Sequence, residues 1–165
     1  MNFSRPTEQD ERMIEKVIAL ASDAISRNKV GVAALLACGD EIIVLDHNPF
    51  ADTQNPLDHA EIVVLNKAGS YLTKCSQEQK SKLTLYSTLE PCLICLLAAS
   101  FVGIRRIVYA ALAEDANQQG QLIKGMTART INPYLTKGEM ELIPGVKREQ
   151  GKALLEQMGI FSSAE

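Results

Sequence analysis

Apolar residues recur every three to four positions in the first stretch of the chain, from Thr7 to Arg27. The apolar positions are Met13, Ile14, Val17, Ile18, Ala21, Ala24 and Ile25, a spacing that is typical of an amphipathic helix. Thr7 stands before this stripe and can cap the helix, while Glu8 and Asp10 place negative charge in its first turn. The pattern therefore predicts a long helix at the start of the chain.

Two runs rich in aliphatic residues follow, at Val32 to Cys38 and Glu41 to Asp46. The intervening pair Gly39-Asp40 favours a tight turn, so the two runs are predicted to form a β-hairpin. The next stretch, His47 to Asp58, carries two prolines and several turn-forming residues. We expect it to be a loop.

A second group of elements occupies the middle of the chain. A helix is expected from His59 to about Ala68, with Gly69 ending it. Leu83 to Ser87 and Ile107 to Ala111 are predicted strands, and a helix from Cys92 to about Phe101 lies between them. A strand, a helix and a strand in this order favour parallel pairing through a right-handed crossover.

The C-terminal third has a weaker pattern. Gln119 to Arg129 is predicted as a helix, Glu139 to Ile143 as a strand, and Val146 to Met158 as a closing helix. No repeat, low-complexity tract or linker divides the chain. Residues 1–165 are therefore expected to form one domain of the α/β class.

Composition narrows the function classes. The chain has 165 residues, of which 46% are hydrophobic and 22% charged, as is usual for a globular protein. Its net charge of −3 gives no general attraction to a nucleic-acid backbone. It has no apolar run long enough for a membrane span, and Met1 to Asp10 lacks the apolar core of a signal peptide. We expect a cytoplasmic protein without a membrane partner, in a compartment where thiols stay reduced.

Two short motifs carry the candidate chemistry, H-x-E from His59 to Glu61 and P-C-x-x-C from Pro91 to Cys95. One imidazole and two thiolates suit a tetrahedral Zn²⁺ whose fourth position stays open to water. Two cysteines three residues apart on a helical turn reach the same ion, and a helix N-terminus favours their thiolate form. The spacing predicts His59, Cys92 and Cys95 as zinc ligands, with Glu61 moving protons beside the metal.

Cysteine and histidine also occur in simpler roles. A single C-x-x-C can be a redox pair or half of a zinc ribbon, but the chain has no second such pair, and redox chemistry leaves the H-x-E motif without a role. The four cysteines could also form two disulfides, although Cys38 and Cys75 more simply fit unpaired thiols. His47 has no neighbour at ligand spacing and is expected to be structural.

In these motifs the chain resembles the cytidine deaminase-like superfamily. Within that superfamily it is most similar to the branch that contains tRNA adenosine deaminases and bacterial guanine deaminases. The resemblance rests on D-H-A-E at 58–61, T-L-E-P-C-L-I-C at 88–95, and Asn48. It implies a three-layer α/β/α fold with a five-stranded mixed sheet, and a homodimer whose sites lie near the subunit interface. It also implies that Asn48 hydrogen-bonds the base; the backbone at Ala60 is a further candidate substrate contact.

The expected substrate is a free nucleobase or nucleoside, with guanine as the first candidate. Tyr109-Ala110-Ala111 followed by Asp115-Ala116 resembles the guanine deaminase branch, where a matching aspartate contacts the base. The resemblance thus implies a substrate-binding role for Asp115.

Three alternatives stay open. Deamination of the wobble adenosine of tRNA would need a basic surface, for which Lys147, Arg148 and Lys152 are candidates, although an ordinary solvated helix face accounts for them more simply. Cytosine or cytidine would use the same zinc chemistry. A structural zinc domain that binds a nucleotide without reacting is the non-enzyme alternative, but such a site has no use for Glu61.

Overall fold

A five-stranded mixed sheet forms the centre of the protein. The computed structural model describes residues 5–117 and 122–159. The strand order is β2-β1-β3-β4-β5, where the strands are β1 (Ala33–Cys38), β2 (Glu41–His47), β3 (Leu83–Leu89), β4 (Arg106–Ala111) and β5 (Glu141–Ile143). β1 pairs antiparallel with β2 and β3, whereas β3, β4 and β5 run parallel. The predicted hairpin and the predicted parallel pair are both confirmed.

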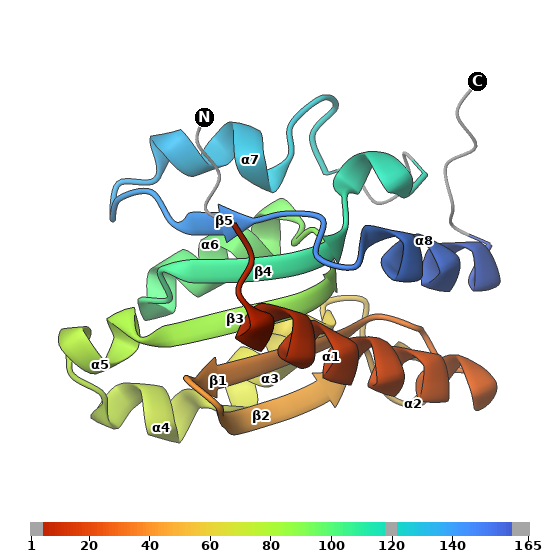
Figure 1. Cartoon of the computed structure of the whole chain (residues 1–165), viewed down its shortest axis with the longest axis horizontal. Helices are drawn as coiled ribbons and strands as arrows, with labels where there is room; N and C mark the ends of the chain where they lie inside the picture. Colours follow the sequence, from red (N-terminus) through yellow and green to blue (C-terminus); the bar gives the residue numbers. More distant parts are fainter. Residues whose placement is uncertain (1–4, 118–121, 160–165) are drawn as a thin grey trace.

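Helices cover both faces of this sheet, which confirms the three-layer α/β/α fold. Figure 1 shows α1 (Glu8–Ser26) and α8 (Arg148–Gln157) in front of the sheet, with α3 (Ala60–Lys67) and α6 (Leu93–Val102) behind it. Thr7 caps α1 by accepting a hydrogen bond from the backbone amide of Asp10, as expected. None of the helices in the described ranges has the length and apolar character that a membrane span needs.

The strands have apolar side chains on both faces because both faces are covered. Along β1, Leu35 packs in the cluster formed with α1 and α8, and its neighbour Leu36 packs in the cluster formed with α3 and α6. The same alternation occurs in β3, where Leu85 and Tyr86 point to opposite layers. Burial on both faces is the reason why the strands are almost continuous apolar runs in the sequence.

Two features differ from the sequence predictions. Gly69 does not end the helical course of the chain; it is the first residue of α4 (Gly69–Lys74), because the amide of Leu72 continues the ladder to Ala68. The helix predicted at 119–129 is wrong over 122–127, and its first three positions, 119–121, lie outside the described residues. Gly125 has a φ of +74° there, so a turn replaces the helix, and only α7 (Ala128–Ile131) follows.

The remaining short elements connect these layers. They are α2 (Phe50–Thr53), α5 (Gln77–Ser81), η1 (Ala113–Asp115) and η3 (Asn132–Tyr134). α2 lies within the expected loop at 47–58, and η1 directly follows β4.

Close approach of α8 to β4 depends on a glycine. A Cβ atom at Gly151 would lie 2.7 Å from the backbone nitrogen of Ala111 and 3.0 Å from Cβ of Ala110. A side chain there would push the helix off the strand, because the nearest atom belongs to the backbone. Gly151 thus lets α8 pack flat against the end of β4 that leads into η1.

A buried ion pair joins α1 to the sheet. Both carboxylate oxygens of Asp10 accept hydrogen bonds from Arg106, at 2.7 and 2.8 Å, and Tyr86 donates a third at 3.1 Å. Burial alone would raise the pKa of Asp10, but the hydrogen bonds from Arg106 and Thr7 outweigh it and lower that pKa to about 2. Breaking such a pair would leave a buried charge without a partner, which is unfavourable. The ion pair therefore fixes the position of α1 on the sheet.

Candidate active site

The two motifs meet where two helices begin. His59 is the N-cap residue of α3, and Cys92 is the N-cap residue of α6. The helices pack against each other behind the sheet, and β3 delivers the chain to Cys92. Pro91 lies directly before this N-cap, one residue outside the helix and not in its first turn as the sequence predicted. Two helix N-termini thus place their positive dipole ends beside the thiols.

Three potential metal ligands converge at this point. Nδ1 of His59 lies 3.4 Å from Sγ of Cys92 and 3.5 Å from Sγ of Cys95, and the two sulfur atoms are 3.4 Å apart. Within the described residues, these three form the group of His, Cys, Asp or Glu side chains whose ligand atoms are close enough to hold one metal ion. His59 and Cys92 are partly exposed, whereas Cys95 is buried.

The thiols have very different proton affinities. The hydrogen bond with Cys95 has the largest effect on the pKa of Cys92 and lowers it. Burial opposes this by raising the pKa, and the hydrogen bond with His59 lowers it further, so that the pKa is about 4. The same hydrogen bond with Cys92, together with burial, raises the pKa of Cys95. Cys92 therefore supplies a thiolate at neutral pH, which is the form that binds metals.

Glu61 lies beside the ligand group on the first turn of α3. One carboxylate oxygen accepts a hydrogen bond from Oγ of Ser87 at 3.0 Å, and the other lies 3.6 Å from Sγ of Cys95. The residue is 4% exposed, and burial raises the pKa of its carboxyl group. A raised pKa makes the carboxylate of Glu61 a stronger proton acceptor than an exposed glutamate, which suits a general acid–base group.

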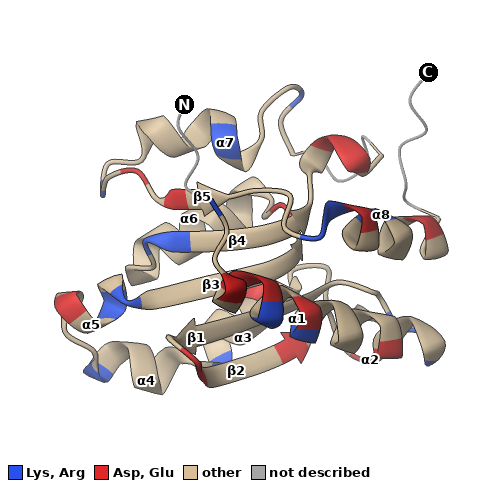
Figure 2. Cartoon of the chain, in the orientation of Figure 1, with Lys and Arg blue, Asp and Glu red and all other residues tan. Residues whose placement is uncertain are grey.

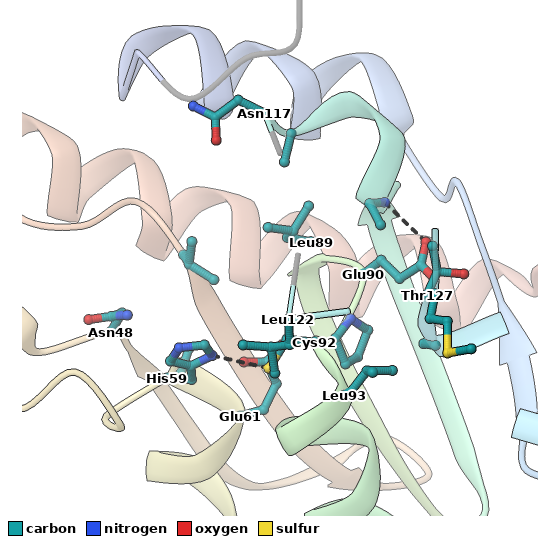
Figure 3. A pocket seen from close by; sticks show the side chains of 17 residues that line it. Asn48, His59, Glu61, Leu89, Glu90, Cys92, Leu93, Asn117, Leu122 and Thr127 are labelled. Carbon is teal, nitrogen blue, oxygen red and sulfur yellow. Dashed lines mark hydrogen bonds between the residues drawn. The ribbon is translucent and has the colours of Figure 1, made fainter. Parts of the chain in front are cut away.

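A pocket opens over this group. Its lining residues are Val32, Asn48, His59, Ala60, Glu61, Leu89, Glu90, Pro91, Cys92, Leu93, Ala113, Ala116, Asn117, Leu122, Met126, Thr127 and Ala128. Figure 3 shows Asn48 next to His59 on one side, and Thr127 on the other. The structure therefore brings Asn48, His59, Ala60, Glu61 and Cys92 to one cavity, with Cys95 just behind them.

Asp115 is the predicted site residue that the structure does not bring to the others. It does not line the pocket, although Ala113 and Ala116 on either side of it do. Its carboxylate accepts two hydrogen bonds from Arg148, at 2.7 and 2.9 Å, and one from the amide of Leu112 at 2.8 Å. The carboxylate that was expected to contact a base instead joins η1 to the start of α8.

Three site residues do not stand out in the sequence. Ser87 lies on the same face of β3 as Leu83 and Leu85. A hydroxyl group at a position where an apolar side chain is expected could have indicated a functional residue. Glu90 stands between the strand and the cysteine motif, where it lines the pocket. Asn117 also lines the pocket, but it follows η1 in a stretch without any recognisable motif.

Known deaminases are similar in sequence to this chain over most of its length. It is 29% identical over 147 residues to a tRNA-specific adenosine deaminase of Bacillus subtilis, covering 89% of this chain and 86% of that protein. It is 28% identical over 146 residues to a tRNA-specific adenosine deaminase of Rickettsia typhi, covering 87% of this chain and 93% of that protein.

Solved structures share the fold. A guanine deaminase from Nitrosomonas europaea superposes with a TM-score of 0.73 at 21% identity, covering 94% of this chain and 86% of that one. A tRNA deaminase studied for A-to-I editing at the wobble position superposes with a TM-score of 0.70 at 25% identity, covering 87% and 99%. A model of the MafB19-like deaminases matches residues 8–148. With the site and the fold in agreement, the chain belongs to the MafB19-like deaminase family, within the cytidine deaminase-like superfamily.

Proposed function

We propose that this deaminase is a zinc-dependent hydrolase that removes the exocyclic amine of a free purine base or nucleoside, with guanine as the leading substrate. The observation that carries the proposal is the convergence of His59, Cys92 and Cys95 with Glu61 on one pocket. A metal site used only for structure is closed by four protein ligands, whereas this group has three among the described residues and adjoins a cavity.

The three ligand atoms fit zinc. With Zn–S near 2.3 Å and Zn–N near 2.0–2.1 Å, a tetrahedral ion places its ligand atoms roughly 3.5–3.8 Å apart. The observed separations of 3.4, 3.4 and 3.5 Å lie close to that range. Nitrogen and thiolate donors are also the set that favours zinc over magnesium or calcium. His59, Cys92 and Cys95 would hold the ion, and the pocket would supply its open position.

Glu61 would carry the protons of the reaction. Zinc, when bound, lowers the pKa of a water ligand towards neutrality. Glu61 accepts a proton from the attacking water, delivers a proton to a ring nitrogen and later protonates the leaving amine. The hydrogen bond from Ser87 fixes one of its oxygens, leaving the other to face the ligand group. The balance is guanine plus water giving xanthine plus ammonia.

The pocket lining supports a flat heterocyclic substrate. Apolar side chains alternate in it with polar ones, and the polar or charged lining residues are Asn48, His59, Glu61, Glu90, Asn117 and Thr127; apolar walls with a few placed polar groups are usual for a small-molecule site. Oδ1 of Asn48 accepts a hydrogen bond from the amide of Phe50 at 2.9 Å, which orients the side chain. Its Nδ2 group can then donate to a ring nitrogen or carbonyl oxygen of a base.

Wobble adenosine in tRNA is the second candidate, and the names of the relatives favour it. The three basic residues that were candidates for such a surface are already paired with acidic side chains. Lys147 pairs with Glu15, Arg148 with Asp115 and Glu114, and Lys152 with Glu149. Figure 2 shows lysines and arginines interspersed with acidic residues around α1 and α8. This charge pattern supports a small substrate over an RNA backbone.

A homodimer remains a prediction, supported by one helix face. Ile94, Leu97 and Phe101 of α6 are 43%, 51% and 76% exposed and lie on one side of the helix. Apolar side chains grouped in this way usually pack against another protein surface. Cytoplasmic location also remains a prediction, consistent with four cysteines that are all free.

A panel of substrates tests the choice. Guanine, adenine, cytosine, their nucleosides and a tRNA anticodon stem-loop are each incubated with the zinc-loaded protein, and ammonia is measured. We expect the fastest release from guanine, and weak stem-loop binding at physiological salt. Inosine formation in the stem-loop, with salt-sensitive binding and no ammonia from guanine, would instead establish the tRNA alternative.

A further inference from the structure

One side of the pocket is built from a part of the chain that contains neither the H-x-E motif nor the P-C-x-x-C motif. We call this side the pocket wall; its residues are Ala113, Ala116, Asn117, Leu122, Met126, Thr127 and Ala128. The metal-ligand group comes from the starts of α3 and α6, whereas the described part of the wall comes from η1, α7 and residues within 116–117 and 122–127. Figure 3 shows the wall residue Thr127 away from His59 and next to Glu90. The distance between wall and ligand group decides what fits between them.

Glu90 links the two parts. It lies two residues before Cys92, and its side chain is fully buried. Oε2 accepts a hydrogen bond from the backbone amide of Ala113 at 3.0 Å and lies 3.7 Å from Nε of Arg129. Ala113 begins η1 and Arg129 belongs to α7, so a single carboxylate oxygen contacts both ends of the pocket wall.

Arg129 extends this link. Its guanidinium group also lies 3.9 Å from Oε2 of Glu114, and Oε1 of Glu114 accepts a hydrogen bond from Arg148 at 2.9 Å. Arg148 in turn binds Asp115. The carboxylate of Glu114 is thus held between α7 and α8, and that of Asp115 is bound to α8. These contacts explain why Asp115 does not line the pocket: its carboxylate anchors the η1 end of the pocket wall to α8.

Two buried polar atoms of Glu90 and Arg129 have no hydrogen-bond partner among the described residues. They are Oε1 of Glu90 and Nε of Arg129. Buried carboxylates and guanidinium groups are costly unless they are paired. A pair whose only use was stability could be replaced by apolar side chains at no loss. This one directly adjoins the cysteine motif and the wall of the pocket.

We propose that Glu90 and Arg129 are positioning residues that fix the pocket wall relative to the metal-ligand group, and thereby set how tightly the substrate base is held. Neither needs to touch the reacting atoms. The proposal rests on the proposed function for its substrate, but the attachment of the wall is a property of the protein alone. A displaced wall contacts the bound base less well in the ground state and in the transition state alike, and such a loss of binding raises KM more than it lowers kcat.

Three variants separate positioning from stability. Arg129→Met removes the charge and keeps the length, Arg129→Lys keeps the charge without the planar fork, and the double variant Glu90→Gln/Arg129→Met removes both charges. Arg12→Met is the matched control, because Arg12 pairs with Asp40 on an exposed part of the surface and does not line the pocket. All are measured as zinc-loaded protein, by amide hydrogen exchange and by KM and kcat on the base that the parent protein deaminates.

We expect Arg129→Met to speed exchange at the Ala113 amide and at 126–129 by about tenfold or more. KM should rise by about tenfold or more, with a smaller change in kcat. Arg129→Lys should recover part of both effects. The double variant should recover thermal stability while its KM stays high, and Arg12→Met should match the parent.

Unchanged exchange of the wall in Arg129→Met would overturn the proposal. So would a double variant in which KM and stability recover together, since that result is what a merely structural pair gives. If the parent deaminates no base in the panel, the proposed function fails, and the exchange measurement alone still decides whether Glu90 and Arg129 hold the wall.

Discussion

Glu61→Gln should reduce deamination by at least about 10²–10⁴-fold, the usual contribution of a general acid–base group. Glutamine keeps the size of the side chain and can still accept the hydrogen bond from Ser87. It cannot accept a proton, and one carboxylate serves several proton transfers in this reaction. The variant should therefore fold and keep its metal while losing turnover. Ammonia release and elemental analysis of the same sample measure both quantities.

Glu78→Gln is the matched control for this change. Glu78 is exposed on α5, where it pairs only with Lys82 among the described side chains. The control should retain full activity. A Glu61→Gln protein that kept more than about a tenth of the parent activity would show that the proton transfers go through another group.

Cys92→Ala should remove both the bound metal and the activity. The thiolate of Cys92 is the ligand whose pKa is lowered to about 4, and only two protein ligands would remain without it. Zinc sites in enzymes normally use three protein ligands, so we expect the zinc content to fall from about one per chain to a small fraction of that. Elemental analysis after dialysis against a weak chelator, followed by the ammonia assay, tests this.

The chain offers its own control for that experiment. Cys75 is also free, but it follows α4 and has no place in the ligand group. Cys75→Ala should keep the zinc content and turnover of the parent. If Cys92→Ala also kept its zinc, the ligand assignment would be wrong; if both variants lost it equally, the loss would reflect general damage to the fold.

Much of the fold was predictable because it depends on local pattern. The apolar period in α1, the hairpin turn at Gly39, and the succession of β3, α6 and β4 all follow from short stretches of sequence. The convergence of His59, Cys92 and Cys95 was predictable for the same reason, since each half of the group is a compact motif at a helix start. Local rules are enough where a side chain's neighbours lie within a few residues.

The pocket wall was not predictable, because its residues are placed by distant partners. Asp115 has the sequence context of a base contact, yet its partner is Arg148, from the start of α8. Glu90 stands next to the cysteine motif, yet its contacts are Ala113 and Arg129. Nothing in a linear sequence indicates which carboxylate a distant arginine will bind, so the motif-rich half of the pocket was predicted and the other half was missed.

The most direct test of the central claim is a single incubation of the zinc-loaded protein with guanine in water enriched in heavy oxygen. Ammonia is measured by an enzymatic assay, and the purine product by mass spectrometry. Hydrolytic deamination predicts equal amounts of ammonia and xanthine, with one heavy oxygen atom in each xanthine formed. A folded protein that holds zinc but releases no ammonia from guanine, or that forms xanthine without the heavy oxygen, would contradict the account.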